Sequence, residues 1–215
     1  TDPISLGVLE APANYGATIC VGDLHGLGLH LNFGGGQAGF IASHDDMRYI
    51  TEFKELVDGM VETTVPGEQG YSVVLIERTH YAMRENGKEF TGTQNNLWTA
   101  PVAVYLSLMG PKGMEEIGHT IMTNAKYAAK KLAGIPGVSL RFPSVFFKEF
   151  VVNFDKTGKT VEEINQLLLS RQIFGGVDLS RDYPELGQSA LYCVTETADK
   201  ESIDRLAGAL QAILN

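Results

Sequence analysis

The sequence lacks several features that would assign it to a class at once. It has no run of about 18 consecutive apolar residues, which argues against a membrane-spanning helix. Residues 1–10 also lack the charged and apolar segments of a signal peptide. Only two of the 215 residues are cysteines, Cys20 and Cys193, and both fall in apolar stretches. We predict two buried thiols in a reducing cytoplasm, because a disulfide or a shared metal would require them to meet in the fold.

Basic residues are scarce as well. The chain has 17 lysine and arginine residues against 26 aspartate and glutamate residues, a net charge of −9. Nucleic acid and anionic membranes are therefore not expected as main partners. The sequence also lacks the phosphate loop, the dinucleotide-binding glycine motif and the nucleophile elbow of hydrolases. The five histidines have no metal-binding spacing on a helix, so we predict no metal site. A site built from Asp23, His25 and His30 is the alternative.

The residues that are present are typical of a globular α/β protein. Apolar residues make up 44% of the chain, and its length suffices for one or two domains with a core. In the first half, β-branched runs predict strands, and helical spacing of apolar residues predicts helices. The expected strands are 16–22, 38–44 and 71–77, and the expected helices are 45–60 and a buried one at 94–109.

The second half carries clearer helix signals. GPKG at 110–113 interrupts the chain, and GIPG at 134–137 ends the long amphipathic helix that follows. Thr160 and Glu163 have the spacing of a capping box at the start of a helix. The patterns predict helices over 114–135, 160–173 and 199–214, with strands within 139–154 and 190–196.

These elements suggest three parts. Strands and helices alternate after residue 137, which is typical of a small α+β domain with helices on one face of its sheet. We therefore divide the chain into the remainder of a larger lobe (1–113), a linking helix (114–137) and a small domain (138–215).

A glycine-rich loop follows the first predicted strand. Residues 21–36 read VGDLHGLGLHLNFGGG, with an acid and a histidine just after the strand. Such a loop can hold a small ligand, although glycine often serves a turn alone. Leu24 and His25 are followed by Gly26, at the place where a nucleophile would be needed for catalysis. From these residues alone, a binding site and a plain turn both stay open.

Longer segments carry a family resemblance. They are DPISLGVLEAPANYGATICVGD (2–23), LNFGGGQAGFIAS (31–43), AVYLSLMGPKGMEEIG (103–118) and GGVDLSRDYPELGQSALYCVTE (175–196). Together they resemble subunit 1 of the P-protein family of the glycine cleavage system, the decarboxylating glycine dehydrogenases. The resemblance spans essentially the whole chain and about the C-terminal half of that subunit. It implies an α/β fold, the C-terminal half of a fold-type I pyridoxal-phosphate-dependent transferase.

The resemblance also gives Gly26 a meaning. In this family the sister subunit has Leu-His-Lys at this loop, and its lysine amine binds pyridoxal phosphate covalently. Gly26 has no amine, and none of the ten lysines of the chain lies on the loop. The resemblance therefore implies no catalytic residue on this chain, with the cofactor held by a lysine-bearing subunit 2 in a heterotetramer. Glycine is the implied substrate and the lipoyl H-protein the implied acceptor of the aminomethyl group, and the isolated chain is expected to be inactive.

Three residues are implied in cofactor binding. In related aminotransferase-like enzymes, a Gly-Thr pair just before a helix reaches a neighbouring subunit's site, where its hydroxyl and the helix-start amides bind the cofactor phosphate. Gly92 and Thr93 occupy the equivalent place, although Thr93 could serve only as a helix N-cap. His25, beside the missing lysine, could line the cofactor cavity or satisfy only a hydrogen bond within the loop.

The chain departs from the family in loops expected near the active site. The family's Pro-Gly-Arg is absent from 53–64, its Gly-Gly-Pro becomes Gly34–Gly36, and its Ala-Thr-Ser-Asn-Ile-Cys-Thr-Asn-Gln segment becomes GKEFTGTQNN at 87–96. Two alternatives to the family activity therefore stay open. One is a catalytically silent scaffold or regulatory homologue, and the other is a pyridoxal-phosphate enzyme subunit that acts on another small amino acid.

Overall fold

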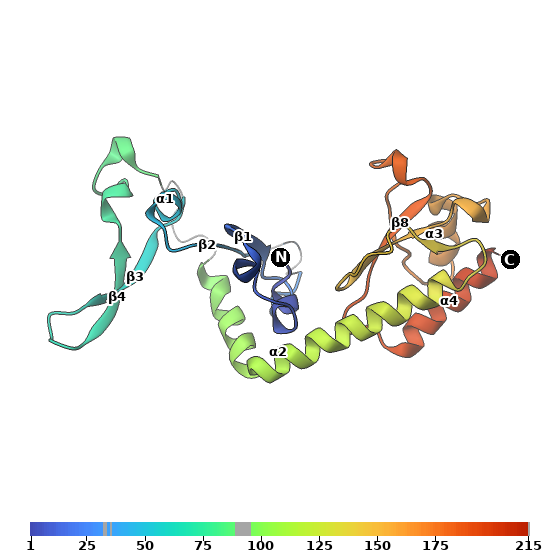
Figure 1. The fold of residues 1–215 in the computed structure, drawn as a ribbon, viewed down its shortest axis with the longest axis horizontal. Helices are drawn as coiled ribbons and strands as arrows, with labels where there is room; N and C mark the ends of the chain where they lie inside the picture. Colours follow the sequence, from blue (N-terminus) through green and yellow to red (C-terminus); the bar gives the residue numbers. More distant parts are fainter. Residues whose placement is uncertain (32–33, 35, 89–95, 215) are drawn as a thin grey trace. The chain divides into compact units, whose positions relative to one another are not determined.

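The structure is a computed structural model that describes residues 1–31, 34, 36–88 and 96–214. The chain divides into two compact units, unit 1 (Thr1–Met114) and unit 2 (Glu115–Asn215), and each is described by itself (Figure 1). Both contain helices and strands, which confirms the predicted α/β class.

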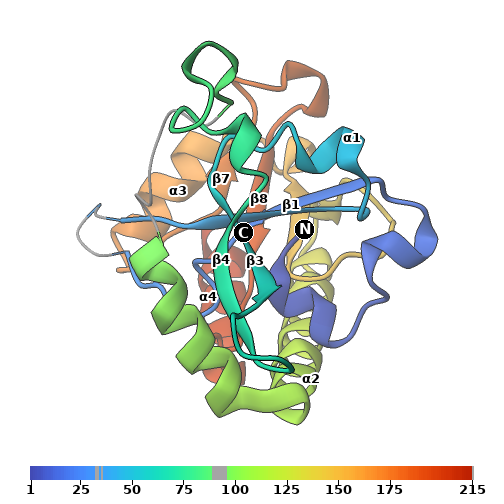
Figure 2. The ribbon, with the colours of Figure 1, turned by 90° about the vertical axis from the view of Figure 1, so that its left-hand side faces the viewer.

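Two antiparallel strand pairs organise unit 1. β1 (Ile19–Asp23) pairs with β2 (Gly39–Ser43), and β3 (Val57–Glu62) pairs with β4 (Gln69–Val74), as Figure 2 shows. The strands predicted at 16–22, 38–44 and 71–77 are confirmed with shifted ends. Short 3₁₀ helices complete the unit: η1 (Pro3–Gly7), η2 (Pro12–Tyr15), η4 (Ile76–Arg78) and η5 (Arg84–Asn86).

The helix predicted over 45–60 is mostly wrong. Only α1 (Met47–Ile50) is helical, and Asp46 caps it by accepting a hydrogen bond from the Arg48 amide. Residues from Val57 onwards belong to β3. The cause lies further along the chain, where Gly67 at φ +81° helps close a hairpin that pairs six residues of β3 with β4. This pairing outweighs the helical spacing of apolar residues in the single segment.

α2 (Asn96–Ala133) contains both long predicted helices and the predicted interruption between them. Gly110, at φ +60° and ψ −179°, breaks the helix where GPKG was expected to do so. The predicted burial of 94–109 is wrong for this chain, because Leu97, Val104 and Leu108 are 78%, 58% and 82% exposed. From Glu115 onwards the helix belongs to unit 2.

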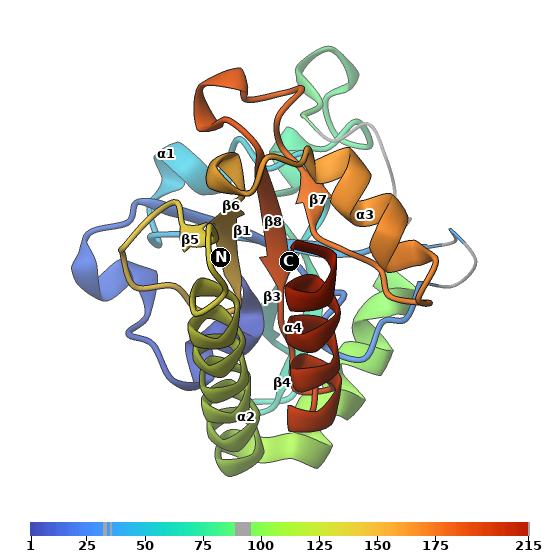
Figure 3. The same cartoon turned by 90° about the vertical axis from the view of Figure 1, so that its right-hand side faces the viewer.

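Unit 2 is built on a four-stranded antiparallel sheet in the order β5–β6–β8–β7. These strands are β5 (Ser139–Leu140), β6 (Glu149–Asn153), β7 (Val177–Asp178) and β8 (Ser189–Cys193). α3 (Val161–Leu169), α4 (Lys200–Leu214) and the second part of α2 provide the helical layer, in which α2 and α4 lie side by side (Figure 3). The strands and helices predicted after residue 137 are thereby confirmed.

A single apolar core holds unit 2 together. Alternate residues of the two central strands enter it, as the pairing of Phe150 with Tyr192 and of Val152 with Ala190 requires. The helices contribute buried side chains of their own: Ala125, Ala128, Ala129 and Leu132 from α2, Val161, Ile164 and Leu168 from α3, and Ile203, Ala207, Leu210 and Ile213 from α4.

The capping box predicted at the start of α3 is confirmed. The Glu163 amide donates to the Thr160 hydroxyl at 3.2 Å, and the Thr160 amide donates back to the Glu163 carboxylate at 2.8 Å. Asp199, just before α4, accepts a hydrogen bond from the Ser202 amide.

The predicted burial of both cysteines is wrong. Cys20 is half-buried, and Cys193 is exposed. Cys193 follows Tyr192 on β8, and successive residues of a strand face opposite sides of the sheet. Because Tyr192 occupies the core, Cys193 points to the other side.

Across the described part of the chain, no helix combines the length and apolar character that a membrane crossing requires.

Candidate functional site

The loop after β1 is a turn held by hydrogen bonds. The Asp23 carboxylate accepts a hydrogen bond from the His25 amide at 3.0 Å, and the Leu27 amide donates to the Leu24 carbonyl at 3.0 Å. The Leu24 amide donates to the Ala38 carbonyl at 2.9 Å, and this hydrogen bond joins the loop to the residue just before β2. The backbone around Gly26 is therefore fixed on both sides by hydrogen bonds.

Gly26 itself has a backbone conformation that admits a side chain. The residue is exposed, and its φ lies outside the left-handed region. A Cβ at Gly26 would lie 3.1 Å from Cδ1 of Ile4, the end of a flexible side chain in η1. A side chain at this position would therefore require the buried Ile4 side chain to shift by a few tenths of an ångström.

His25 is half-buried, and its Nδ1 lies 3.3 Å from the Leu29 carbonyl oxygen. When Nδ1 carries the proton, it donates to this carbonyl, and Nε2 is left as an acceptor. Leu27 and Leu29 anchor the same stretch, since both side chains are buried. His25 thus makes a hydrogen bond within the loop, and this bond sets the orientation of its ring.

The first part of α2 packs against this loop. A Cβ at Gly36 would overlap the indole of Trp98, and one at Gly28 would lie 3.2 Å from the Tyr105 ring. Val102, between them on the helix, is buried. The spacing of Trp98, Val102 and Tyr105 places all three on one helix face. The start of α2 is therefore beside the glycine-rich loop.

The predicted phosphate-binding residues Gly92 and Thr93 lie outside the described residues. They precede the first residue of α2, Asn96, by three or four positions. Trp98, in the first turn of that helix, is in contact with the loop at Gly36.

Sequence reasoning missed the residues that support the site. Trp98 and Tyr105 could have been suspected, because Trp98 is the only tryptophan and the two share a helix face. Arg78 carried no such signal. It is buried, and its guanidinium donates to the carbonyls of Thr51 and Glu55 at 3.0–3.3 Å. It thereby holds the irregular segment between α1 and β3.

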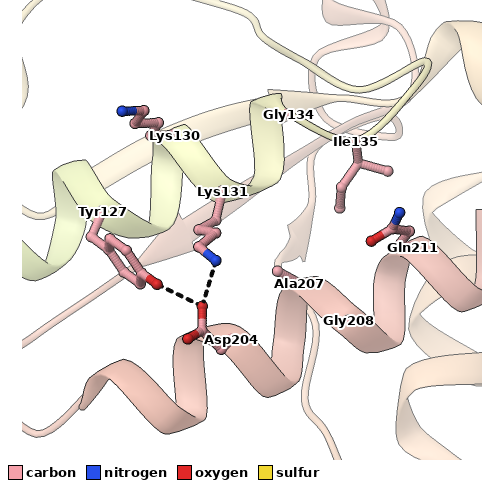
Figure 4. Close-up of a pocket in the computed structure, with 9 residues that line it drawn as sticks. All are labelled: Tyr127, Lys130, Lys131, Gly134, Ile135, Asp204, Ala207, Gly208 and Gln211. Carbon is pink, nitrogen blue, oxygen red and sulfur yellow. Dashed lines mark hydrogen bonds and ion pairs between the residues drawn. The ribbon is translucent and has the colours of Figure 1, made fainter.

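Away from this loop, a polar cluster lies between α2 and α4, inside unit 2 (Figure 4). Asp204 accepts from the Tyr127 hydroxyl at 2.7 Å and pairs with Lys131 at 2.9 Å and Lys200 at 2.6 Å. The Lys200 ammonium, then the Tyr127 hydroxyl and the Lys131 ammonium, hold the pKa of Asp204 well below its ordinary value of 3.8. The cluster borders a pocket of about 550 Å³ and joins the two helices.

Potential metal ligands do not converge in the residues that the structure describes. No group of three or more His, Cys, Asp or Glu side chains there could hold an ion, and this includes Asp23, His25 and His30.

Solved structures define the fold class. The structure of a NifS-like protein from Rickettsia africae matches 99% of this chain. The match covers 52% of the NifS-like protein's own chain, with a TM-score of 0.60 at 14% sequence identity. The sphingosine-1-phosphate lyase of Burkholderia pseudomallei matches 92% of this chain and 37% of its own, with a TM-score of 0.59 at 17% identity. The chain accordingly has part of the fold of the fold-type I pyridoxal-phosphate-dependent enzymes.

The family follows from closer matches. The profile of the glycine cleavage system P-protein matches residues 1–210, and this chain belongs to that family. A crystal structure of the glycine decarboxylase (P-protein) of the glycine cleavage system, in inhibitor-bound form, matches 99% of the chain and 47% of its own, with a TM-score of 0.86 at 31% identity. The family resemblance of the sequence is thereby confirmed.

Two curated relatives carry the name probable glycine dehydrogenase (decarboxylating) subunit 1. The relative from Desulfitobacterium hafniense is 37% identical over 212 residues, which cover 99% of this chain and 46% of the relative. The relative from Pyrococcus furiosus is 35% identical over 213 residues, which cover 99% of this chain and 46% of that relative. The chain thus spans about half the length of the curated relatives it matches.

Proposed function

We propose that this chain is part of the non-lysine-bearing subunit of a glycine-decarboxylating P-protein. The carrying observation is Gly26, which follows Leu24 and His25 on a hydrogen-bonded loop, where the family resemblance puts the sister subunit's lysine. A lysine-bearing subunit 2 holds pyridoxal phosphate, glycine is the substrate, and the aminomethyl group passes to a lipoyl H-protein. The isolated chain is inactive, because it cannot anchor the cofactor.

The residues of this loop do not fit covalent attachment of the cofactor. Residues 21–36 contain no lysine, so the loop offers no amine for the cofactor aldehyde. When bound to the partner, pyridoxal phosphate supplies the electron sink that decarboxylation of an amino acid needs. The part left to this chain is positioning. His25 holds the turn through Leu29, and the face of Trp98 and Tyr105 fixes the loop.

The phosphate contact is assigned to Gly92 and Thr93. The start of α2 lies beside the glycine-rich loop through Trp98 and Gly36, which supports this role. A helix start with free amides and a hydroxyl just before it is a suitable site for an anion. In this proposal the two residues complete the partner's cofactor site.

The departures from the family keep the two other candidates in view. They fall where the family resemblance expects active-site loops, at 53–64, Gly34–Gly36 and 87–96. A scaffold would assemble with the partner and leave its activity unchanged. A subunit for another small amino acid would support decarboxylation of that amino acid instead of glycine.

Borohydride reduction of the assembled complex tests the proposal. The chain is co-purified with a lysine-bearing subunit, loaded with pyridoxal phosphate, reduced and digested. We expect a stoichiometric phosphopyridoxyl label on the partner and none on this chain. Gly26→Lys is the matched control, because it restores an amine at an exposed position whose backbone conformation admits a side chain. A stoichiometric label on any lysine of the unmodified chain would contradict the proposal.

Release of CO₂ from carboxyl-labelled glycine separates the three candidates. With lipoyl H-protein present, we expect release by the complex and none by either subunit alone. Release by the partner alone at the same rate would identify a scaffold. Release only from alanine or serine would identify a different substrate.

A further inference from the structure

The pocket between α2 and α4 lies wholly within unit 2 (Figure 4). It has a volume of about 550 Å³, and we call it the α2–α4 groove. Ile135 and Ala207, both buried, give it an apolar lining, and Gln211 adds an amide. The proposed glycine chemistry makes no use of this groove, so its residues need an explanation of their own.

Two lysines share one carboxylate in the groove. The Lys131 ammonium lies 2.9 Å from Oδ1 of Asp204, and the Lys200 ammonium lies 2.6 Å from Oδ2. The Tyr127 ring is beside both lysines, with its centroid 5.3 Å from the Lys131 nitrogen and 5.7 Å from the Lys200 nitrogen. One carboxylate balances only one ammonium, so the cluster keeps an uncompensated positive charge whose position is fixed.

More positive charge lies along α2. Lys130 lines the groove, is exposed, and forms no ion pair with any residue that the structure describes. Lys126 is also exposed and lies one helical turn before Lys130. Over 126–135 and 200–204 the chain has four lysines against two acids, although its net charge is −9. Such a local excess of cations favours an anionic partner.

Gly208, in the wall of the groove, is not explained by the fold. It lies inside α4, where glycine is less favourable than alanine. Its φ is outside the left-handed region, and a Cβ there would have no neighbouring atom within 4 Å. Neither the backbone nor the packing of the described residues therefore requires glycine. A glycine in open space is typical of a place where another backbone approaches closely.

We propose that the α2–α4 groove is the docking surface for an acidic segment of another protein. Carboxylates of that segment pair with Lys130 and Lys131, and its backbone passes over Gly208. An ammonium group has three donors, so Lys131 keeps donors for a ligand beside its bond to Asp204. A protein segment is favoured over a small anion, because the lysines continue along α2 for a turn beyond the groove.

The exposed lysines also distinguish the groove from a surface that the rest of a subunit would bury, since lysine is almost never fully buried without a partner. The inference goes beyond the proposed activity and does not depend on it.

Binding of a labelled acidic peptide to the full chain tests the proposal. The probe is a short fluorescein-labelled peptide of glutamate, leucine and alanine, and the same peptide with glutamine in place of glutamate is its control. We expect saturable binding of the glutamate peptide that weakens as salt is added. The glutamine peptide should bind about tenfold more weakly or less. No saturable binding, equal binding of both peptides, or inorganic phosphate binding as tightly as the glutamate peptide would overturn the proposal.

Gly208→Gln separates a docking role from a structural one. Glutamine is the better helix former, so we expect the thermal midpoint to rise while peptide affinity falls about tenfold. Ala212→Gln is the matched control, because Ala212 is exposed on the next turn of α4 but does not line the groove. It should change affinity less than about twofold. A stabilised Gly208→Gln chain with unchanged affinity would refute the close approach at Gly208.

Lys130→Gln removes a charge and leaves the Asp204 cluster intact. We expect peptide affinity to fall about tenfold with no change in the thermal midpoint, because Lys130 is exposed and outside that cluster. Lys156→Gln is the matched control, since Lys156 is an exposed lysine of the same unit on η6 (Asp155–Thr157). Equal losses from the two substitutions would indicate only a general attraction to positive charge and would exclude a site in the groove.

Discussion

Gly28 and Gly26 lie two residues apart on the same loop, but the backbone makes different demands on them. Gly28 has φ +85°, and a Cβ there would also press on the Tyr105 ring. We expect Gly28→Ala to lower the free energy of local opening by about 1–2 kcal/mol, since left-handed backbone disfavours a side chain. Gly26→Ala is the control and should cost less than Gly28→Ala, because the φ of Gly26 lies outside the left-handed region. Exchange rates of the Leu24 and Leu27 amides measure both, and equal effects would contradict this account.

Thr93 has two possible duties that a single substitution separates. Thr93→Val keeps the shape but removes the hydroxyl. In the assembled enzyme we expect cofactor affinity to fall by about 1–3 kcal/mol, the effect of losing a hydrogen bond to a charged acceptor. Loss of an N-cap alone would lower stability by about 1 kcal/mol and leave affinity unchanged. Cofactor dissociation and thermal unfolding of the complex are the two measurements. A loss of stability without a loss of affinity would reduce Thr93 to a cap.

Asp204 should make unit 2 sensitive to acid. Lys200, Tyr127 and Lys131 lower its pKa in the folded state below the ordinary value of 3.8. The stabilisation is therefore fully present above pH 3.8 and is lost as the pH falls through the lowered pKa. We expect Asp204→Asn to lower the thermal midpoint at pH 7, by an amount that shrinks below pH 4. Glu201→Gln, on the same helix but outside the cluster, should show no such pH dependence.

At the scale of elements, the second part of α2, predicted as a linking helix, contributes buried side chains to the core of unit 2. Ala125, Ala128 and Leu132 are fully or almost fully buried against α4 and the sheet. Truncating one buried leucine costs about 2–5 kcal/mol, and a whole domain has about 5–15 kcal/mol in total. We therefore expect residues 115–215 to unfold cooperatively in urea and residues 138–215 to show no cooperative transition. A cooperative transition of the shorter fragment would instead support residues 138–215 as the domain.

The predicted elements that are confirmed depend on local signals. The capping box of Thr160 and Glu163 lies within four residues, and the strand at 16–22 is a short β-branched run between glycines. The helix at 45–60 failed because its second half pairs with residues that follow a turn. Such pairing depends on the partner strand, so the sequence of a single segment does not predict it.

At the scale of the whole molecule, the sequence indicated the family and the lack of a lysine in residues 21–36, but not the residues that support this loop. Gly26 is recognisable because its neighbours Leu24 and His25 keep the family pattern. The contacts of Trp98 with Gly36 and of Arg78 with Thr51 join segments many residues apart. Side-chain packing of this kind forms only in the folded chain, so no local sequence motif predicts these contacts.

The single tryptophan turns this packing into a built-in spectroscopic probe. Because Trp98 is the only indole in the chain and rests on Gly36, tryptophan emission from this protein reports on one place only, the junction of the glycine-rich loop with α2. A tryptophan-free partner could be titrated against the unlabelled chain while the emission maximum is followed. Events confined to unit 2 would leave the signal unchanged, and rearrangement of the loop would shift it.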